Sequence, residues 1–174
     1  MKRAPRLPSR SSVVALPVPA LLATALTLLG CANHGATLGV SVIPPAGAPV
    51  SFRGDVLQIL GNHGCAQPSC HNSSSLGAPM SLDAGTAYQD LVGATACEAP
   101  ALKRVEAASS AMSYLINKLN GDLATIQSAG GCAGCPNFTP AGNCGSQMPL
   151  IGAPLPSSEI QVIRDWIDQG AKNN

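Results

Sequence analysis

The sequence predicts an all-α domain in which a few short helices are separated by long loops. Four stretches carry apolar side chains at the spacing of a helix with one buried face. They are residues 52–62, 82–92, 110–119 and 157–169. The chain also contains 18 Gly, 15 Pro and 7 Cys, and residues 121–156 are especially rich in these three types. Such a composition predicts a long loop that cross-links hold in place.

The first expected helix, residues 52–62, leads directly into a segment with two cysteines and a histidine. Its buried face consists of Phe52, Val56, Ile59 and Leu60. The second helix is expected to start at residues 82–84, where Asp83 is a natural N-cap. It covers Tyr88, Leu91 and Val92.

The third expected helix, residues 110–119, has apolar side chains at positions i, i+3, i+4 and i+7. These are Met112, Leu115, Ile116 and Leu119, so we expect Met112 to lie in the core. The last helix has a capping box of Ser158 and Gln161 at its start and Gly170 just after its end. Its buried face is Ile160, Ile163, Trp166 and Ile167.

The N-terminal residues have the pattern of a bacterial lipoprotein signal. The first ten residues hold four basic side chains and no acid, and an apolar run ends in Leu28-Leu29-Gly30-Cys31. We therefore expect residues 1–30 to be removed and Cys31 to be lipidated, although an uncleaved anchor is an alternative. Residues 31–50, with several Pro, Gly and Ala, are expected to form a flexible tether, and residues 51–174 the folded domain.

The charge of the mature chain argues against a nucleic-acid partner. All nine acidic residues follow Cys31, but only six of the ten basic residues do, which gives a net charge of −3. No basic patch interleaved with aromatic side chains is present. Ala32 after the lipidated cysteine favours the outer membrane, so the expected location is there or on the periplasmic face of a membrane.

The segment Cys65-Ala66-Gln67-Pro68-Ser69-Cys70-His71 has the arrangement that holds a c-type haem. Two thiols add to the vinyl groups of the porphyrin, and the adjacent imidazole reaches the iron. The usual spacer has two residues and this one has four, which requires an outward bulge that Pro68 would stiffen. The alternatives are a Cys65–Cys70 disulfide and a zinc site. The zinc site would use Cys65, Cys70, His71, Cys132 and Cys135.

The number of cysteines and the small supply of core side chains are both consistent with one covalent haem. With Cys31 lipidated and the motif cysteines attached to haem, four remain in an oxidising compartment, which predicts two disulfides. Of the three pairings we favour Cys132 with Cys135 and Cys97 with Cys144; a redox-active dithiol at Cys132 and Cys135 is an alternative. The mature chain has only five aromatic residues, so a flat apolar cofactor would complete a modest core.

Residues 52–171 resemble a monohaem cytochrome c of the planctomycete and myxobacterial type. The matching pieces occur in the family's order: residues 52–60, the Cys-Cys-His motif, Leu76-Gly77 with Leu82, residues 88–93, residues 113–119, Met148-Pro149, and residues 159–171. The resemblance implies the cytochrome c fold, in which the first and last helices cross and the haem lies between helices and loops. It also implies His71 as the proximal ligand of the iron and Met148 as the distal ligand.

The position of Met148 agrees with this role. It lies in a loop before the last helix, and Pro149 restricts the backbone there. Its rival Met80 is only nine residues beyond His71, a short path around the haem edge to the opposite face. His63 is expected to be a loop histidine near the haem edge, since His71 already occupies the ligand position of the motif.

The sequence therefore predicts a membrane-tethered c-type cytochrome that carries single electrons between redox partner proteins, with one covalent haem c and no catalytic residues. Its iron would be six-coordinate. One alternative is a non-haem surface lipoprotein, stapled by disulfides, that binds a partner. Another is a haem enzyme or gas sensor with an open distal site. A hydrolase is unsupported, because no set of nucleophile, base and acid stands out among the Ser, His and Asp residues.

Overall fold

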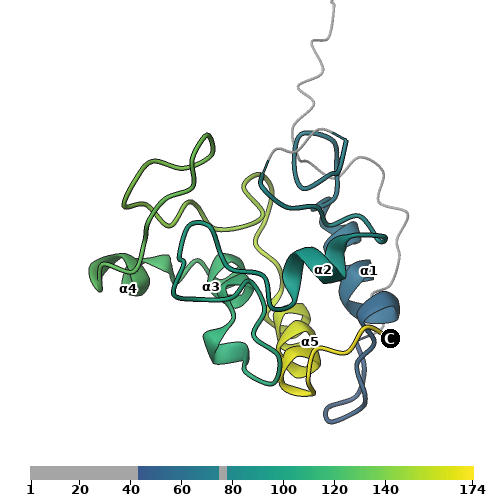
Figure 1. The fold of residues 1–174 in the computed structure, drawn as a ribbon. Helices are drawn as coiled ribbons and strands as arrows, with labels where there is room; N and C mark the ends of the chain where they lie inside the picture. The colour runs from purple at the N-terminus through teal and green to yellow at the C-terminus, as the bar shows by residue number, and fades with distance from the viewer. Residues whose placement is uncertain (1–42, 75–77) are drawn as a thin grey trace, which may run out of the picture.

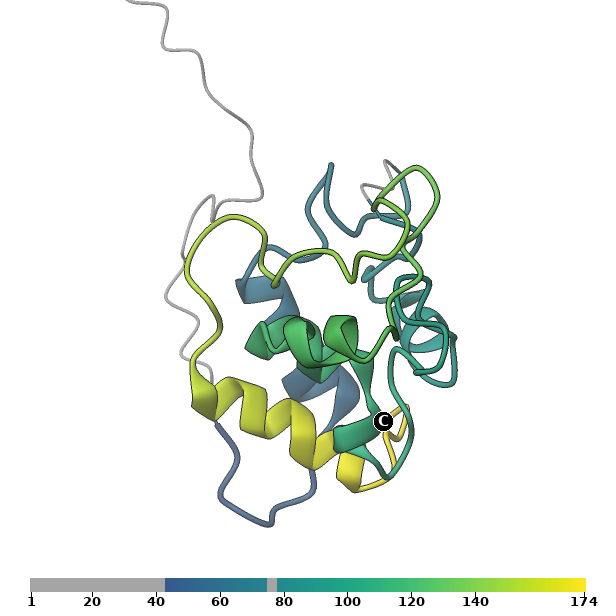
Figure 2. The same cartoon turned by 90° about the vertical axis from the view of Figure 1, so that its left-hand side faces the viewer.

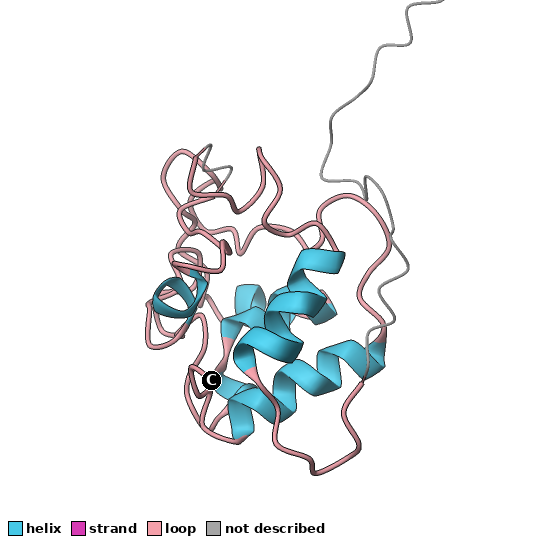
Figure 3. Cartoon of the chain, turned by 90° about the vertical axis from the view of Figure 1, so that its right-hand side faces the viewer, coloured by secondary structure: helices cyan, strands magenta, loops and turns pink. Residues whose placement is uncertain are grey.

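The computed structural model describes residues 43–74 and 78–174. The expected signal, Cys31 and most of the expected tether lie outside these ranges. Within them the chain forms helices and isolated β-bridges but no β-strand, which agrees with an all-α class (Figure 3).

Seven short helical elements account for the regular structure of the described residues. They are the π-helical turn η1 (Phe52–Val56), α1 (Leu57–Asn62), α2 (Ala87–Leu91), the 3₁₀ turn η2 (Ser110–Met112), α3 (Tyr114–Asn120), α4 (Leu123–Ser128) and α5 (Ser157–Asp168). The loops of residues 63–74 and 129–150 lie together on one side of the helices in both views (Figures 1 and 2). The expected first and last helices are thus present, and α4 adds a helix inside the stretch expected to be a loop.

The first and last helical segments pack through aromatic side chains. Phe52 and Trp166 stack with their ring centroids 4.9 Å apart, and the Tyr88 ring meets the Phe52 ring edge-on at 5.4 Å. Trp166 is fully buried, and its indole N–H donates a 2.9 Å hydrogen bond to the carbonyl of Lys172. A large aromatic side chain with its polar group satisfied is a strong packing centre, so α5 is fixed on η1.

The start of η1 is closed by side chains and by the C-terminal segment. The Ser51 hydroxyl accepts a 3.0 Å hydrogen bond from the Gly54 N–H. The Phe52 N–H donates to the Asn174 side chain at 2.9 Å, and the Arg53 N–H donates to the Asn174 carbonyl at 3.0 Å. N–H groups that a helix start leaves without intrahelical partners are thereby satisfied, and residues distant in sequence are joined.

The expected helix of residues 110–119 is interrupted at Ser113, where the backbone is extended (φ −99°, ψ 112°). The Ser113 hydroxyl donates to the Ser109 carbonyl at 2.9 Å and accepts from the Glu106 N–H at 2.9 Å. Such bonds between a serine and nearby backbone compete with helix continuation. Met112 is consequently 51% exposed, so the prediction that it lies in the core was wrong.

The expected N-caps are also different in the structure. Asp83 precedes α2 by several residues, and its carboxylate accepts hydrogen bonds from the backbone N–H of Ser73 at 2.9 Å and the amide of Asn72 at 3.0 Å. These bonds, led by that from the Ser73 hydroxyl, lower the pKa of Asp83. Asp83 therefore fastens the chain just after the Cys-Cys-His motif.

At α5 no capping box forms. Pro156 occupies the N-cap position without a side-chain hydrogen bond, and the Gln161 amide donates instead to the Asp165 carboxylate at 2.7 Å. The end of α5 follows expectation, because Gly170 has a φ of +99°, a backbone conformation that glycine adopts without steric cost.

Two hydrophobic clusters make up the core of the described residues. The larger one joins η1, α1, α2, α3 and α5 around Trp166, and the smaller one contains Ala96, Ala99, Tyr114, Leu123 and Cys144. Among residues 43–74 and 78–174, no helix has the length and apolar character that crossing a membrane requires.

Replacing Trp166 with alanine should destabilise the domain by about 3–5 kcal/mol, because the substitution leaves a large cavity beneath Phe52. The measurement is the free energy of unfolding from denaturant titration. Met112→Ala is the matched control, since this exposed side chain should leave stability nearly unchanged. Equal unfolding midpoints for Trp166→Ala and the unmodified protein would contradict the packing of α5 on η1.

Candidate functional site

A cavity of about 450 Å³ lies between the loop of the Cys-Cys-His motif and the loop that precedes α5. Its wall is mostly apolar and includes members of both hydrophobic clusters, among them Leu60, Leu91, Leu119, Ala96 and Tyr114. This volume and this lining are typical of pockets that bury a cofactor or another small molecule.

The motif loop is shaped by hydrogen bonds within its own backbone. The Cys70 N–H donates to the Gln67 carbonyl at 3.0 Å, and the His71 N–H donates to the Cys65 carbonyl at 3.0 Å. Gln67, Pro68 and Ser69 are exposed, whereas Cys70 is buried. The four-residue spacer therefore bulges outward while Cys65, Cys70 and His71 all border the cavity.

His71 is the most unusual polar group in the cavity wall. Its Nδ1 atom is buried and has no hydrogen-bond partner. Burial lowers the pKa of His71, the nearby cations of Lys118 and Arg104 lower it further, and a hydrogen bond to the Met80 backbone opposes them in part. The imidazole is thus held neutral, which is the form that binds a metal ion, and a buried unpaired nitrogen is a mark of a site that takes a ligand.

The two motif cysteines are not joined to each other. Cys65 carries a free thiol, so the Cys65–Cys70 disulfide considered above is not formed. Cys70 is disulfide-bonded in this structure, and covalent attachment of a cofactor there would begin from the reduced thiol. Burial raises the pKa of Cys65 from 9.0 to about 11, so this thiol stays protonated at neutral pH.

Both candidate methionines border the cavity, but their surroundings differ. Met80 is partly packed on the larger cluster, and its backbone hydrogen-bonds with His71. The backbone N–H of Met148 donates to the Lys118 carbonyl at 2.8 Å, which fixes it at the end of α3. Met80 therefore belongs to the segment that is bonded to His71, and Met148 reaches the cavity from the loop that precedes α5. Met112 does not border it.

The disulfides differ from the pairing we favoured. Cys97 bonds Cys135 and Cys132 bonds Cys144, so neither Cys132–Cys135 nor Cys97–Cys144 forms. The Ala133 N–H donates to the Glu98 carbonyl at 2.8 Å. This hydrogen bond joins the segment that holds Cys97 to the segment that holds Cys132 and Cys135.

A zinc site is not assembled from these residues. The sulfur atoms of Cys132 and Cys135 are both used in disulfides. Over residues 43–74 and 78–174, no three His, Cys, Asp or Glu side chains are grouped closely enough to hold a metal ion. The redox-active dithiol considered for Cys132 and Cys135 is not formed either, because each of these cysteines is bonded to a different partner.

His63 borders the cavity but is engaged by a carboxylate. Its Nε2 lies 2.5 Å from Oε2 of Glu159, at the start of α5. Glu159 is buried, so the contact links the motif loop to the last helix. This is the place expected for a histidine at the cavity edge.

Four polar residues of the cavity wall were not singled out from the sequence: Glu98, Arg104, Tyr114 and Lys118. Arg104 donates to the carbonyls of Asp90 at 2.8 Å and Pro79 at 3.1 Å. Lys118 forms a 2.9 Å ion pair with Glu98. The one available signal was the i, i+4 spacing of Tyr114 and Lys118, which places both on one face of a helix.

In protein folded without a cofactor, Cys65 should be alkylated by iodoacetamide at pH 8 roughly 100-fold more slowly than in denatured protein. A rise in pKa from 9.0 to about 11 reduces the reactive thiolate by that factor below pH 9, and the deficit disappears as pH approaches 11. Peptide mass spectrometry measures the modification at Cys65 itself. Equal rates for folded and denatured protein at pH 8 would show that the thiol is not buried.

No family model, no curated protein and no solved structure matches this chain. The function must therefore be argued from the motif, from the cavity and from the chemistry of the residues that border it.

Proposed function

We propose that this protein is an exported, membrane-tethered c-type cytochrome that carries single electrons between redox partner proteins. The observation that carries the proposal is the composition of one cavity wall. Cys65, Cys70, His71 and Met148 all border the same cavity, although Met148 is far from the other three in sequence. The sequence pattern alone selected these four residues.

The residues of the cavity suit a covalent haem. Thioether bonds from Cys65 and Cys70 would hold the porphyrin edge, and the neutral imidazole of His71 would supply the proximal ligand. When bound, the haem would supply a one-electron couple between ferric and ferrous iron. The mostly apolar wall would limit the contact of a bound haem with water, and so limit how strongly its surroundings stabilise the extra positive charge of the ferric state.

Met148 is the proposed distal ligand. A thioether is a neutral, soft donor, so it favours ferrous over ferric iron and raises the reduction potential. The Leu82 N–H donates to the His71 carbonyl at 2.7 Å, which keeps the neighbouring Met80 close to His71 and supports Met148 over its rival. If His71 and Met148 both bound the iron, no position on it would remain for a substrate, as expected for an electron carrier.

The proposed fold and location complete this picture. The proposed fold is that of cytochrome c, and the packing of η1 on α5 through Phe52 and Trp166 supports the crossing of first and last helices that this fold requires. Lipidation at Cys31 would tether the domain to a membrane, with residues 31–50 as the tether and residues 51–174 as the haem domain. The domain would then exchange electrons with partners in the periplasm or at the outer membrane.

Removing the attachment residues should abolish covalent haem. In a host that attaches c-type haem after export, the Cys65→Ala, Cys70→Ala double variant should give no haem-stained band on a denaturing gel. His71→Ala should yield no stable holoprotein, because the proximal ligand is lost.

The matched control is the Cys97→Ala, Cys135→Ala double variant, which also removes two cysteines but should keep its covalent haem. A blank lane for the unmodified protein would favour the disulfide-stapled lipoprotein instead. Full haem loading in the Cys65→Ala, Cys70→Ala variant would refute attachment at the motif.

Met148→Ala should remove the thioether-to-iron charge-transfer band of the oxidised protein and admit water or small ligands to the iron. Met148→His should stay low-spin with a lower reduction potential, since a second imidazole replaces the thioether. Met80→Leu and Met112→Leu are the controls and should change neither property. Retention of the band in Met148→Ala would show that another methionine is the distal ligand, with Met80 the first to examine. Absence of the band from the unmodified oxidised protein would also refute Met148, and His63 would then be the first candidate.

A further inference from the structure

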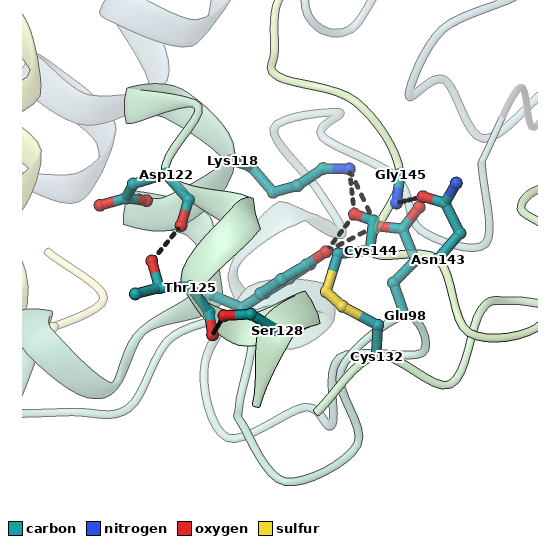
Figure 4. Close-up of a disulfide and its surroundings, with 10 residues drawn as sticks. Glu98, Lys118, Asp122, Thr125, Ser128, Cys132, Asn143, Cys144 and Gly145 are labelled. Atoms are coloured by element: carbon teal, nitrogen blue, oxygen red, sulfur yellow. Dashed lines mark hydrogen bonds and ion pairs between the residues drawn. A yellow bond between two sulfur atoms is a disulfide. The ribbon is translucent and has the colours of Figure 1, made fainter. Parts of the chain in front are cut away.

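A buried polar cluster lies behind the loop that carries Met148 (Figure 4). The Tyr114 hydroxyl lies 2.5 Å from the Cys144 carbonyl and 3.0 Å from Oε2 of Glu98. Nζ of Lys118 lies 2.9 Å from the same carboxylate oxygen and 3.3 Å from the same carbonyl. Two side chains of α3, Tyr114 and Lys118, therefore converge on one backbone carbonyl of the loop, and the Glu98 carboxylate accepts from both of them.

The loop between Cys144 and Met148 is attached to α3 at both of its ends. Cys144 is fully buried and is bonded to Cys132. The Gln147 amide donates to the Leu119 carbonyl at 3.0 Å, and the Met148 N–H donates to the Lys118 carbonyl at 2.8 Å. Cys144 and Met148 are thus both hydrogen-bonded to α3.

Gly145 shows how closely the loop approaches the cluster. Its φ is +71°, and a Cβ atom at this position would come within 2.2 Å of Oε1 of Glu98 and 2.6 Å of Nζ of Lys118. A larger residue here would be strained at this φ and would have to displace the ends of the Glu98 and Lys118 side chains. The backbone is therefore pressed against the cluster and does not merely pass near it.

The cluster is protected from solvent and keeps its donors. Tyr114 is 5% exposed, and the side chains of Lys118 and Glu98 are 12% and 17% exposed. Burial, together with the neighbouring Glu98 carboxylate, raises the pKa of Tyr114, so the phenol remains a hydrogen-bond donor. Hydrogen bonds in a water-poor site of this kind are costly to leave unmade.

We propose that Tyr114, supported by the Glu98–Lys118 ion pair, is a positioning group that holds the Met148 loop in place for ligation of the iron. The inference rests on the proposed function and adds the residues that keep a weak thioether bond closed. Tyr114 acts through the Cys144 carbonyl and has no contact with the iron in this account. Loss of the phenol hydroxyl frees the loop to move and leaves the helical packing of η1 and α5 intact.

The test compares Tyr114→Phe with Tyr88→Phe in the full-length exported protein. The hydroxyl of Tyr88 also donates to a backbone carbonyl, that of Ala171 at 2.9 Å, but on the C-terminal segment. Both variants lose one hydroxyl and keep the ring. Any effect peculiar to Tyr114 therefore reports on the Met148 loop and not on the loss of a tyrosine hydrogen bond in general.

Two readouts are needed. The first is hydrogen exchange of the peptide containing residues 144–148, which does not depend on haem; exchange should become about tenfold faster in Tyr114→Phe and stay unchanged in Tyr88→Phe. The second is binding of imidazole to the ferric protein, which must displace Met148. Its affinity should rise about tenfold in Tyr114→Phe alone.

Gly145→Ala is a second variant that displaces the same ion pair, and it should change both readouts in the same direction as Tyr114→Phe. Unchanged imidazole affinity in Tyr114→Phe, or an equal rise in Tyr88→Phe, would overturn the positioning role while leaving the proposed cytochrome intact. If the exported protein carried no haem, the proposed function and the ligand role of Met148 would both be overturned, even if hydrogen exchange of residues 144–148 were faster in Tyr114→Phe.

Discussion

The packing of Phe52 against Trp166 is the interaction on which the rest of the structure depends. It fixes η1 to α5, with ring centroids 4.9 Å apart and both side chains buried. η1 continues into α1 and then into the motif loop, while α5 follows directly on the loop that carries Met148. One aromatic contact therefore sets the relative position of the two loops that enclose the cavity, and the His63–Glu159 contact joins the same two segments at the cavity edge.

The size of the cavity and the charge state of His71 follow from the residues that surround them. With only five aromatic residues in the expected mature chain, the domain has few side chains large enough to fill the space between its two hydrophobic clusters. Burial and the cations of Lys118 and Arg104 hold His71 in its neutral form. The disulfides Cys97–Cys135 and Cys132–Cys144 fasten the opposite wall, so a loop with little regular structure is nevertheless held against the cavity.

The sequence predicted those features that local pattern determines. The helices around Phe52 and Trp166 follow from apolar periodicity, and the outward bulge of residues 67–69 follows from the need to keep both cysteines and His71 on one side. The break at Ser113 was missed because hydrogen bonds of its hydroxyl to the backbone of Ser109 and Glu106 compete with the helix, and apolar periodicity does not report them. The favoured disulfide pairing was wrong because the pairing depends on how residues 97, 132, 135 and 144 are brought together by the fold, and the spacing of the cysteines does not determine that.

For the candidate site, too, the sequence indicated the residues that belong to a local pattern and missed those that only the fold brings together. A local motif selected Cys65, Cys70 and His71, the family resemblance selected Met148, and all four border the cavity. Glu98 and Arg104 were missed because only the fold brings them to the cavity wall. The charges that act on His71, and the cluster behind the Met148 loop, are consequences of tertiary structure and leave almost no signature in the sequence.

The central claim is that Cys65 and Cys70 hold a haem covalently beside His71. Mass spectrometry of the protease-derived peptide that spans residues 65–71, taken from protein exported in a host able to attach c-type haem, tests it most directly. The account predicts a single peptide that carries one haem through two thioether bonds and absorbs visible light after denaturation. The same peptide with both sulfur atoms as thiols or in disulfides, and with no haem, would contradict it.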